Sequence, residues 1–110
     1  MRDAEQVSTA TEPTTINVAR VYDYLLGGTN NYAVDRAGAD QIKSLFPELE
    51  DWAWCNRGFH QRAARWLASE VGIRQFIDIG SGLPTQVNTH EVVRQSTEGE
   101  DKAPRVVYVD

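Results

Sequence analysis

The chain has 110 residues and a mass of 12.3 kDa, which leaves room for one small domain. Its composition, with 41% hydrophobic and 25% charged residues, is that of a globular protein, and no apolar run approaches the roughly 20 residues that cross a bilayer. A net charge of −5 argues against nucleic acid as a partner, because phosphate contacts require clustered lysine and arginine.

Residues 1–16 predict a disordered N-terminal tail, because they are polar and contain almost no apolar side chain before Ile16. They also lack the apolar segment of a signal peptide. An amphipathic helix should follow, with Asn17 as its N-cap and Gly27-Gly28 as its end. Its apolar stripe has the i, i+3, i+4, i+7 spacing and consists of Val18, Val21, Tyr22 and Leu25.

Two further helices are predicted, from about Ala33 to Phe46 and from about Glu48 to Val71. Pro47 separates them and Gly72 ends the second. The side chains expected on their buried faces are Val34, Gly38, Ile42, Leu45 and Phe46 in the former helix, and Trp52, Phe59, Ala63, Trp66 and Leu67 in the latter.

The longer helix also carries the only cysteine, Cys55, which permits no intrachain disulfide and favours a reducing, cytoplasmic setting. Its position between aromatic residues predicts a small buried side chain rather than a nucleophile. The next two residues, Asn56-Arg57, are a candidate polar site, whereas Arg57, Arg62 and Arg65 together are typical of a solvated helix face. No Cys or His pair has ligand spacing, so the sequence predicts no metal site.

A glycine turn directly follows a strand signal and is the most informative feature of the chain. Phe76, Ile77 and Ile79 favour a central strand of a covered parallel sheet, since they do not alternate with polar residues. The turn, Gly80-Ser81-Gly82, therefore lies at the carboxyl end of a strand, where such sheets bind ligands. Asp78 places a carboxylate in the same crevice.

The residues of the turn distinguish between two ligand classes. A dinucleotide fingerprint requires a third glycine, but Thr85 stands at that position, after Pro84. A carboxylate such as Asp78 would lie uncomfortably near a pyrophosphate, whereas it suits an ammonium or a sulfonium. The pattern favours S-adenosylmethionine over NAD, although a simple tight strand-to-helix connection would also explain it.

A second strand is predicted from Arg105 to Val109, and Asp110 follows it. An acid at this position hydrogen-bonds ribose hydroxyls in nucleotide-binding α/β units, usually about 20 residues after the turn. The longer separation here is explained by a polar surface loop over residues 95–104. For Asp110 alone, a role without ligand is an equally good interpretation.

A crossover helix from Val87 to Arg94 would join the two parallel strands. Asn88, Thr89 and His90 should lie in its first turn, near the mouth of the crevice. His90 is the one candidate general base, with a capping or surface role as the preferred alternative.

With these residues in place, the chain resembles the class I S-adenosylmethionine-dependent methyltransferases, and more narrowly a mostly actinobacterial family of unassigned substrate. Three segments carry the narrower resemblance. They are Asn17-Val18-Ala19-Arg20-Val21-Tyr22-Asp23-Tyr24-Leu25-Leu26-Gly27-Gly28 with Asn30, Asn31 and Asp35; Asn56-Arg57 with Phe59; and Asp78 to Thr85 with Asn88-Thr89-His90.

The resemblance implies an α/β, Rossmann-like fold with a seven-stranded sheet, of which this chain would hold the part up to the second strand. The expected organisation is a tail at 1–16, a helical segment at 17–72 and the first β-α-β unit, incomplete, at 73–110. The family fold therefore predicts a truncated domain, and two strands alone should leave Trp52, Phe59 and Trp66 incompletely covered.

The implied cofactor is S-adenosylmethionine, which Asp78 would hold at the methionine end and Asp110 at the ribose. Backbone groups of Gly80, Ser81 and Gly82 would line it.

The first helix would cover the cofactor as a lid, with Arg20 available for a carboxylate and Tyr24 for stacking or a hydrogen bond. The alternative for this helix is an exposed Arg20–Asp23 ion pair, which would contribute little to stability. The methyl acceptor, the catalytic base and the oligomeric state are not specified by the sequence.

Two alternatives to a methyltransferase stay open: half of an NAD-linked oxidoreductase, and a non-catalytic fragment that binds no cofactor or serves only for interaction.

Overall fold

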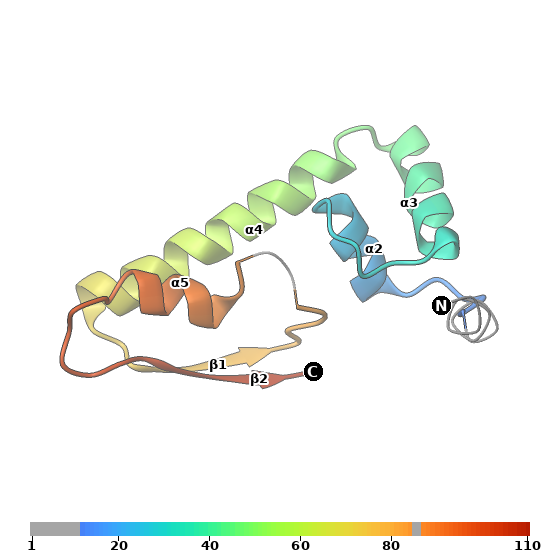
Figure 1. Ribbon diagram of the computed structural model, residues 1–110. Coiled ribbons are helices and arrows are strands. Elements are labelled where there is room, and N and C mark those ends of the chain that lie inside the picture. The colour runs from blue at the N-terminus through green and yellow to red at the C-terminus, as the bar shows by residue number, and fades with distance from the viewer. Residues whose placement is uncertain (1–11, 85–86) are drawn as a thin grey trace. The chain divides into compact units, whose positions relative to one another are not determined.

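The computed structural model describes residues 12–84 and 87–110, which form two compact units divided between Glu50 and Asp51 (Figure 1). The first unit contains the helices α2, Val18–Leu25, and α3, Ala33–Leu45. The second contains almost all of α4, Leu49–Trp66, and the elements that follow it. These are the π-helical turn η1, Leu67–Val71, the strand β1, Gln75–Ile79, the helix α5, Thr89–Gln95, and the strand β2, Arg105–Val109.

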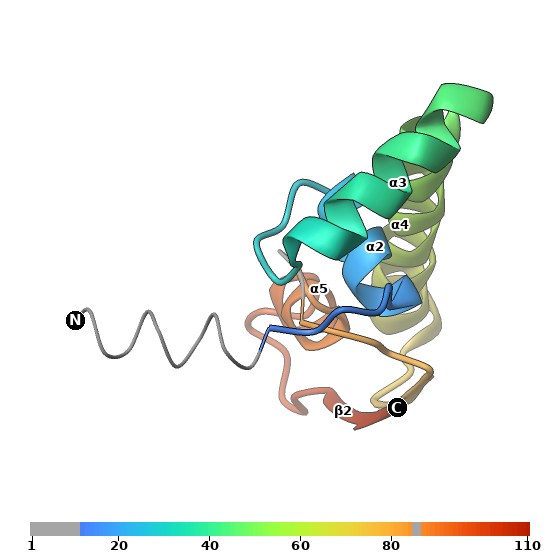
Figure 2. The same cartoon turned by 90° about the vertical axis from the view of Figure 1, so that its right-hand side faces the viewer.

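In the first unit, α2 packs against α3 (Figure 2). The bounds of α2 confirm the prediction, because the side chain of Asn17 accepts a hydrogen bond from the Arg20 amide at 3.1 Å. Gly27, with a φ of 81°, ends the helix in the left-handed conformation that glycine tolerates. The predicted tail is held at its end, since Ile16 lies against Gly38 and would overlap any added side chain there.

The buried face of the first unit differs from the predicted stripes. Val18, Leu45 and Phe46 are mostly exposed, at 84%, 75% and 57%, and Ala39, which was not predicted, is buried. Leu25 and Gly38 are buried as predicted. Length accounts for the exposed end of α3 at Leu45 and Phe46, because α2 with 8 residues extends about 12 Å and α3 with 13 residues about 20 Å. The shorter helix cannot cover the whole of the longer one.

In the second unit, α4 and η1 together confirm the predicted long helix, which Gly72 closes with a φ of 86°. Small residues on this helix pack with α5 and the inner face of the strands. The core consists of Ala64, Ala68, Val92 and Val93, with Phe76 and Val106 packed against it.

The large aromatic residues of α4 lie outside this core. Trp52, Phe59 and Trp66 are 67%, 65% and 56% exposed, and Cys55 is exposed too. The prediction that they are buried is therefore wrong, because the alanine face of α4 supplies the contacts with α5. The expectation that two strands leave the aromatic side chains incompletely covered is confirmed.

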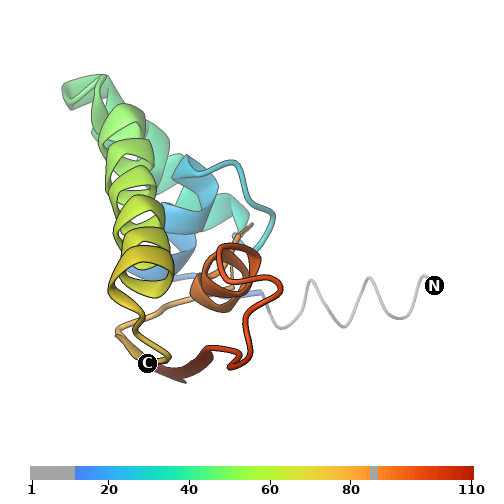
Figure 3. The ribbon, with the colours of Figure 1, turned by 90° about the vertical axis from the view of Figure 1, so that its left-hand side faces the viewer.

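The strands β1 and β2 pair in parallel, from Gln75 opposite Arg105 to Ile79 opposite Val109. The helix α5 joins them and contacts β2, which confirms the predicted crossover (Figure 3). Only one face of the pair is covered. The outward side chains Ile77, Ile79, Val107 and Val109 are 46% to 79% exposed, so the prediction of a strand covered on both faces is wrong for the described residues.

None of the helices in residues 12–84 and 87–110 has both the length and the apolar composition needed to cross a membrane.

Candidate functional site

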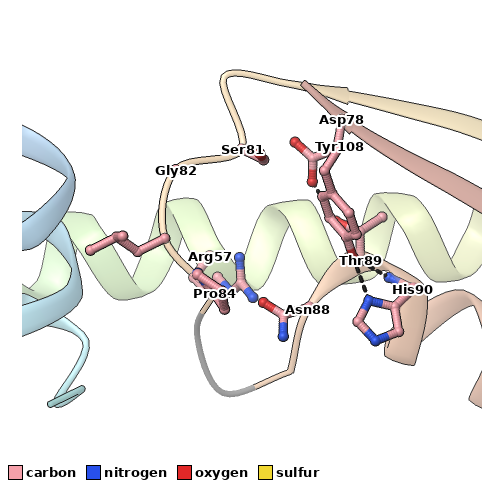
Figure 4. A pocket seen from close by; sticks show the side chains of 10 residues that line it. Arg57, Asp78, Ser81, Gly82, Pro84, Asn88, Thr89, His90 and Tyr108 are labelled. Atoms are coloured by element: carbon pink, nitrogen blue, oxygen red, sulfur yellow. Dashed lines mark hydrogen bonds between the residues drawn. The ribbon is translucent and has the colours of Figure 1, made fainter. Parts of the chain in front are cut away.

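A pocket of about 230 Å³ opens where the strands of the second unit end (Figure 4). Its walls come from the glycine turn and the two residues after it, the start of α5, and one residue each of α4, β1 and β2. The lining residues are Arg57, Asp78, Ser81, Gly82, Leu83, Pro84, Asn88, Thr89, His90 and Tyr108. The structure therefore brings together the predicted turn, Asp78 and the first turn of the crossover helix.

The glycine turn is fixed to the end of β2 by its own amides. Gly80 donates to the Val109 carbonyl at 2.7 Å and Ser81 to the same oxygen at 3.3 Å. The Gly82 amide donates to Oδ1 of Asp110 at 3.3 Å. These three N–H groups are thus engaged within the protein, so they do not form the donor cradle that a pyrophosphate requires.

Gly80 itself is not among the lining residues, although it directly precedes Ser81, which is. Gly80 has a φ of 68°, in the left-handed region, and a β-carbon added to it would meet no atom within 4 Å. Gly82 has the same φ of 68°. The turn thus combines a conformation that favours glycine with open space beside Gly80.

Asp78 is the acidic side chain within the pocket. The Thr89 hydroxyl donates to its Oδ2 at 2.7 Å (Figure 4), while Oδ1 has no hydrogen-bond partner among the described residues. Asp78 is half-buried and Thr89 is 5% exposed. A carboxylate held by one oxygen and open at the other is suited to a cationic ligand.

Tyr108 belongs to the site although the sequence analysis did not identify it. It stands opposite Asp78 in the strand register, and its hydroxyl oxygen accepts a hydrogen bond from the His90 amide at 2.9 Å. The phenol and Nδ1 of His90 are 2.5 Å apart, with the rings edge to face. Whichever of the two groups donates, Nδ1 is engaged with the phenol of Tyr108, which argues against His90 as a general base through Nδ1.

The first turn of α5 is fixed by Asn88 and Glu91. The Asn88 amide and side chain donate to Oε1 of Glu91 at 3.0 and 2.9 Å. The backbone bond, followed by the side-chain bond, lowers the pKa of Glu91. Arg57 donates a hydrogen bond to the carbonyl of Val87, just before this turn. Arg57 also lines the pocket, and it is the one residue of the predicted Asn56-Arg57 pair that does.

Arg20 and Tyr24 lie in the first unit, where both have partners. Arg20 donates to Oδ2 of Asp35 at 2.7 Å and to the Thr15 carbonyl at 2.8 Å. Tyr24 donates to Oδ1 of Asp40 at 3.1 Å. The ion pair of Arg20 is therefore with Asp35, and the predicted exposed pair with Asp23 is wrong.

Asp23 and Asp35 are buried, with exposed fractions of 2% and 0%, and both bind backbone amides. Asp23 accepts from the Asn30 amide at 2.8 Å and from the Asn31 side chain at 2.9 Å. Asp35 accepts from the amides of Asn17 and Tyr32 at 3.0 and 2.9 Å. The conspicuous polar residues of this segment thus hold the α2–α3 connection together.

The pKa of Asp35 reflects these contacts. Burial alone would raise it, but the hydrogen bonds from Arg20 and from the amides of Tyr32 and Asn17, together with the charge of Arg20, lower it overall. The carboxylate is thereby kept ionised beside the guanidinium.

No group of three or more His, Cys, Asp or Glu residues within the described part of the chain is arranged to hold a metal ion.

Comparison with known proteins gives consistent matches. Residues 4–110 match the family described as S-adenosyl methyltransferase. A provisionally assigned methyltransferase from Thermobifida fusca is 50% identical over 87% of this chain, with a TM-score of 0.79. A DUF574 family protein from Streptomyces avermitilis is 39% identical over 86% of it, with a TM-score of 0.77. The chain spans 35% and 34% of the lengths of these two structures, and no curated protein matches it.

Proposed function

Because the chain belongs to the S-adenosyl methyltransferase family, we propose that it binds S-adenosylmethionine in the pocket at the ends of β1 and β2. The α/β unit of residues 51–110 agrees with the class I methyltransferase fold. When bound, the cofactor would supply an electrophilic methyl group for transfer to an acceptor that is still to be identified.

The observation that carries this proposal is the polarity of the pocket around Asp78. The Oδ1 of Asp78, which has no partner among the described residues, would accept from the methionine ammonium, while the amides of Gly80, Ser81 and Gly82 are already bonded. A site with an open carboxylate and occupied amides favours a cation over a phosphate. The room beside Gly80 would admit the ligand.

Two further residues have proposed roles: Arg57, which lines the pocket, and Asp110, which lies beside it through its bond to the Gly82 amide. Asp110 uses Oδ1 for the Gly82 amide, which leaves Oδ2 for the ribose hydroxyls. Arg57 is the one Arg or Lys among the described lining residues, so we assign it the methionine carboxylate. Arg20 is less suited to that role, because Asp35 already neutralises it. A lid role for α2 and Tyr24 stays a prediction.

The alternatives are less well supported. An NAD-linked enzyme would need amide donors for its pyrophosphate, and the three amides of the glycine turn are engaged elsewhere. Thr85, on which the sequence argument against NAD rested, lies outside the described residues. The alternative of a fragment that binds no cofactor gives no role to Asp78, whose carboxylate is bonded through Oδ2 and has no partner for Oδ1 among the described residues.

The test is isothermal titration of S-adenosylmethionine into the full-length gene product that contains this chain. In Gly80→Val, the side chain would occupy the open space beside the turn, and binding should be lost. Gly99→Val is the matched control, since Gly99 has a φ of 84° and equally open surroundings but lies in the loop between α5 and β2, away from the glycine turn in the sequence. Equal affinity in the parent and Gly80→Val would remove the turn from the site.

A further inference from the structure

We infer that Thr89 and His60 are positioning residues that orient the Asp78 carboxylate toward the methionine end of S-adenosylmethionine. This inference rests on the proposed function and adds to it two residues that act through Asp78. They come from different helices, α5 and α4, and neither has been assigned a role toward a ligand above.

The three side chains form one continuous hydrogen-bonded row. His60 Nε2 lies 2.7 Å from Oγ1 of Thr89, and the same Oγ1 lies 2.7 Å from Oδ2 of Asp78. Thr89 is buried at 5% exposure, which shields its hydroxyl from water. The row therefore links α4, α5 and β1, and it ends on Oδ2 of Asp78, which leaves Oδ1 for a ligand.

The single hydroxyl proton fixes the direction of the row. Thr89 donates its single hydroxyl proton to Oδ2 of Asp78, so Oγ1 must accept from His60. His60 then carries its proton on Nε2. In any other arrangement, Oδ2 of Asp78 and Nε2 of His60 would compete as acceptors for one proton.

The consequence for the ligand is geometric. A carboxylate held through Oδ2 cannot rotate freely about its Cβ–Cγ bond, so Oδ1 keeps one direction toward the pocket. Such preorganisation raises affinity because less conformational entropy is lost on binding. His60 is an accessible point for testing this, since it lines a second cavity of about 310 Å³ together with Asp78 and Thr89.

Two ligands distinguish a loss of the Asp78 orientation from a general disturbance of the structure around the pocket. S-adenosylmethionine carries the amino acid end that Asp78 would bind, whereas 5′-methylthioadenosine has the same nucleoside and lacks it. Thr89→Val removes the hydroxyl at nearly constant volume and should weaken S-adenosylmethionine about tenfold, with little change for 5′-methylthioadenosine. Thr89→Ser should restore the parent affinity.

A matched control is Thr97→Val. Thr97 is also 5% exposed, but its hydroxyl donates to the Val93 carbonyl at 2.7 Å, outside the pocket. In this variant, the affinity for S-adenosylmethionine relative to that for 5′-methylthioadenosine should be the same as in the parent. His60→Leu provides a second test should Thr89→Val fail to fold. Like Thr89→Val, it should weaken binding of S-adenosylmethionine more than binding of 5′-methylthioadenosine.

The outcomes are distinguishable when all variants are made in the full-length gene product. Absence of S-adenosylmethionine binding in the parent would remove the proposed function and this inference with it. Binding in the parent that is unchanged in both Thr89→Val and His60→Leu would overturn the inference alone. Equally weakened binding of both ligands would also overturn it, since it would show a general structural role.

Discussion

Replacing Asp35 with alanine should selectively destabilise the first unit. Its carboxylate is fully buried and accepts hydrogen bonds from Arg20, Asn17 and Tyr32, so its removal leaves three donors without their partner. Each unsatisfied donor costs about 1–3 kcal/mol. Arg20 is 20% exposed and can regain water, so we take the low end and expect about 3 kcal/mol in total.

Hydrogen exchange measured by mass spectrometry is the appropriate assay, because all three tryptophans lie outside the first unit and tryptophan fluorescence would not report on it. A loss of about 3 kcal/mol corresponds to exchange about a hundredfold faster in peptides from α2 and α3. Peptides from β1 and α5 should exchange as in the parent.

Asp40→Ala is the matched control, because Asp40 lies on the same helix and, within residues 12–84 and 87–110, its one hydrogen bond through the side chain is the exposed one from Tyr24. We expect less than about a twofold change in exchange for this variant. Similar acceleration in Asp35→Ala and Asp40→Ala would refute the role of the buried carboxylate.

Acid provides an independent check on the same residue. The folded-state pKa of Asp35 is lowered from its ordinary value of 3.8, so its contribution to stability is fully present above that value. The contribution is lost as the pH falls through the lowered pKa. The difference between the parent and Asp35→Ala should therefore be constant near neutrality and shrink in strong acid.

Two further predictions concern the ligand and the isolated chain. NADH should not displace S-adenosylmethionine from the full-length gene product in equilibrium competition, and displacement at similar concentration would favour the oxidoreductase alternative. The 110 residues expressed alone should show helix by circular dichroism but melt broadly, because the outer face of β1 and β2 and the α4 aromatics are exposed. A sharp two-state melt with tight binding of S-adenosylmethionine would instead indicate a self-sufficient binding domain.

The helix and strand bounds could be predicted because local signals determine them. Asn17 caps α2 through its own side chain, Gly72 closes the long helix with a positive φ, and Arg105–Val109 forms the strand expected there. The buried faces could not be predicted in the same way. Trp52 looks like a core residue by spacing, but its burial depends on which elements cover it, and spacing carries no information about that.

The same distinction applies to the site. Asp78 and the glycine turn are recognisable because strand, turn and carboxylate are consecutive in sequence. The contact of His60 with Thr89 joins residues 29 positions apart on two helices, which no local pattern indicates. Arg20 and Asp23 are three positions apart on one helix, and their pairing was one of two interpretations. Asp23 instead binds the Asn30 amide and the Asn31 side chain, and Arg20 pairs with Asp35 on the next helix.

Strand register explains why the glycine turn alone does not make the site. In the observed pairing, Asp78 stands opposite Tyr108, and alternation along β2 places Asp110 on the same side as Tyr108. A slip of one residue would turn Val107 and Val109 toward the pocket instead. The carbonyl of Val109 and the carboxylate of Asp110 also hold the amides of the turn. The ligand site therefore depends on β2 as much as on the glycines, and substitutions that weaken β2 pairing should reduce S-adenosylmethionine binding even where they lie outside the pocket.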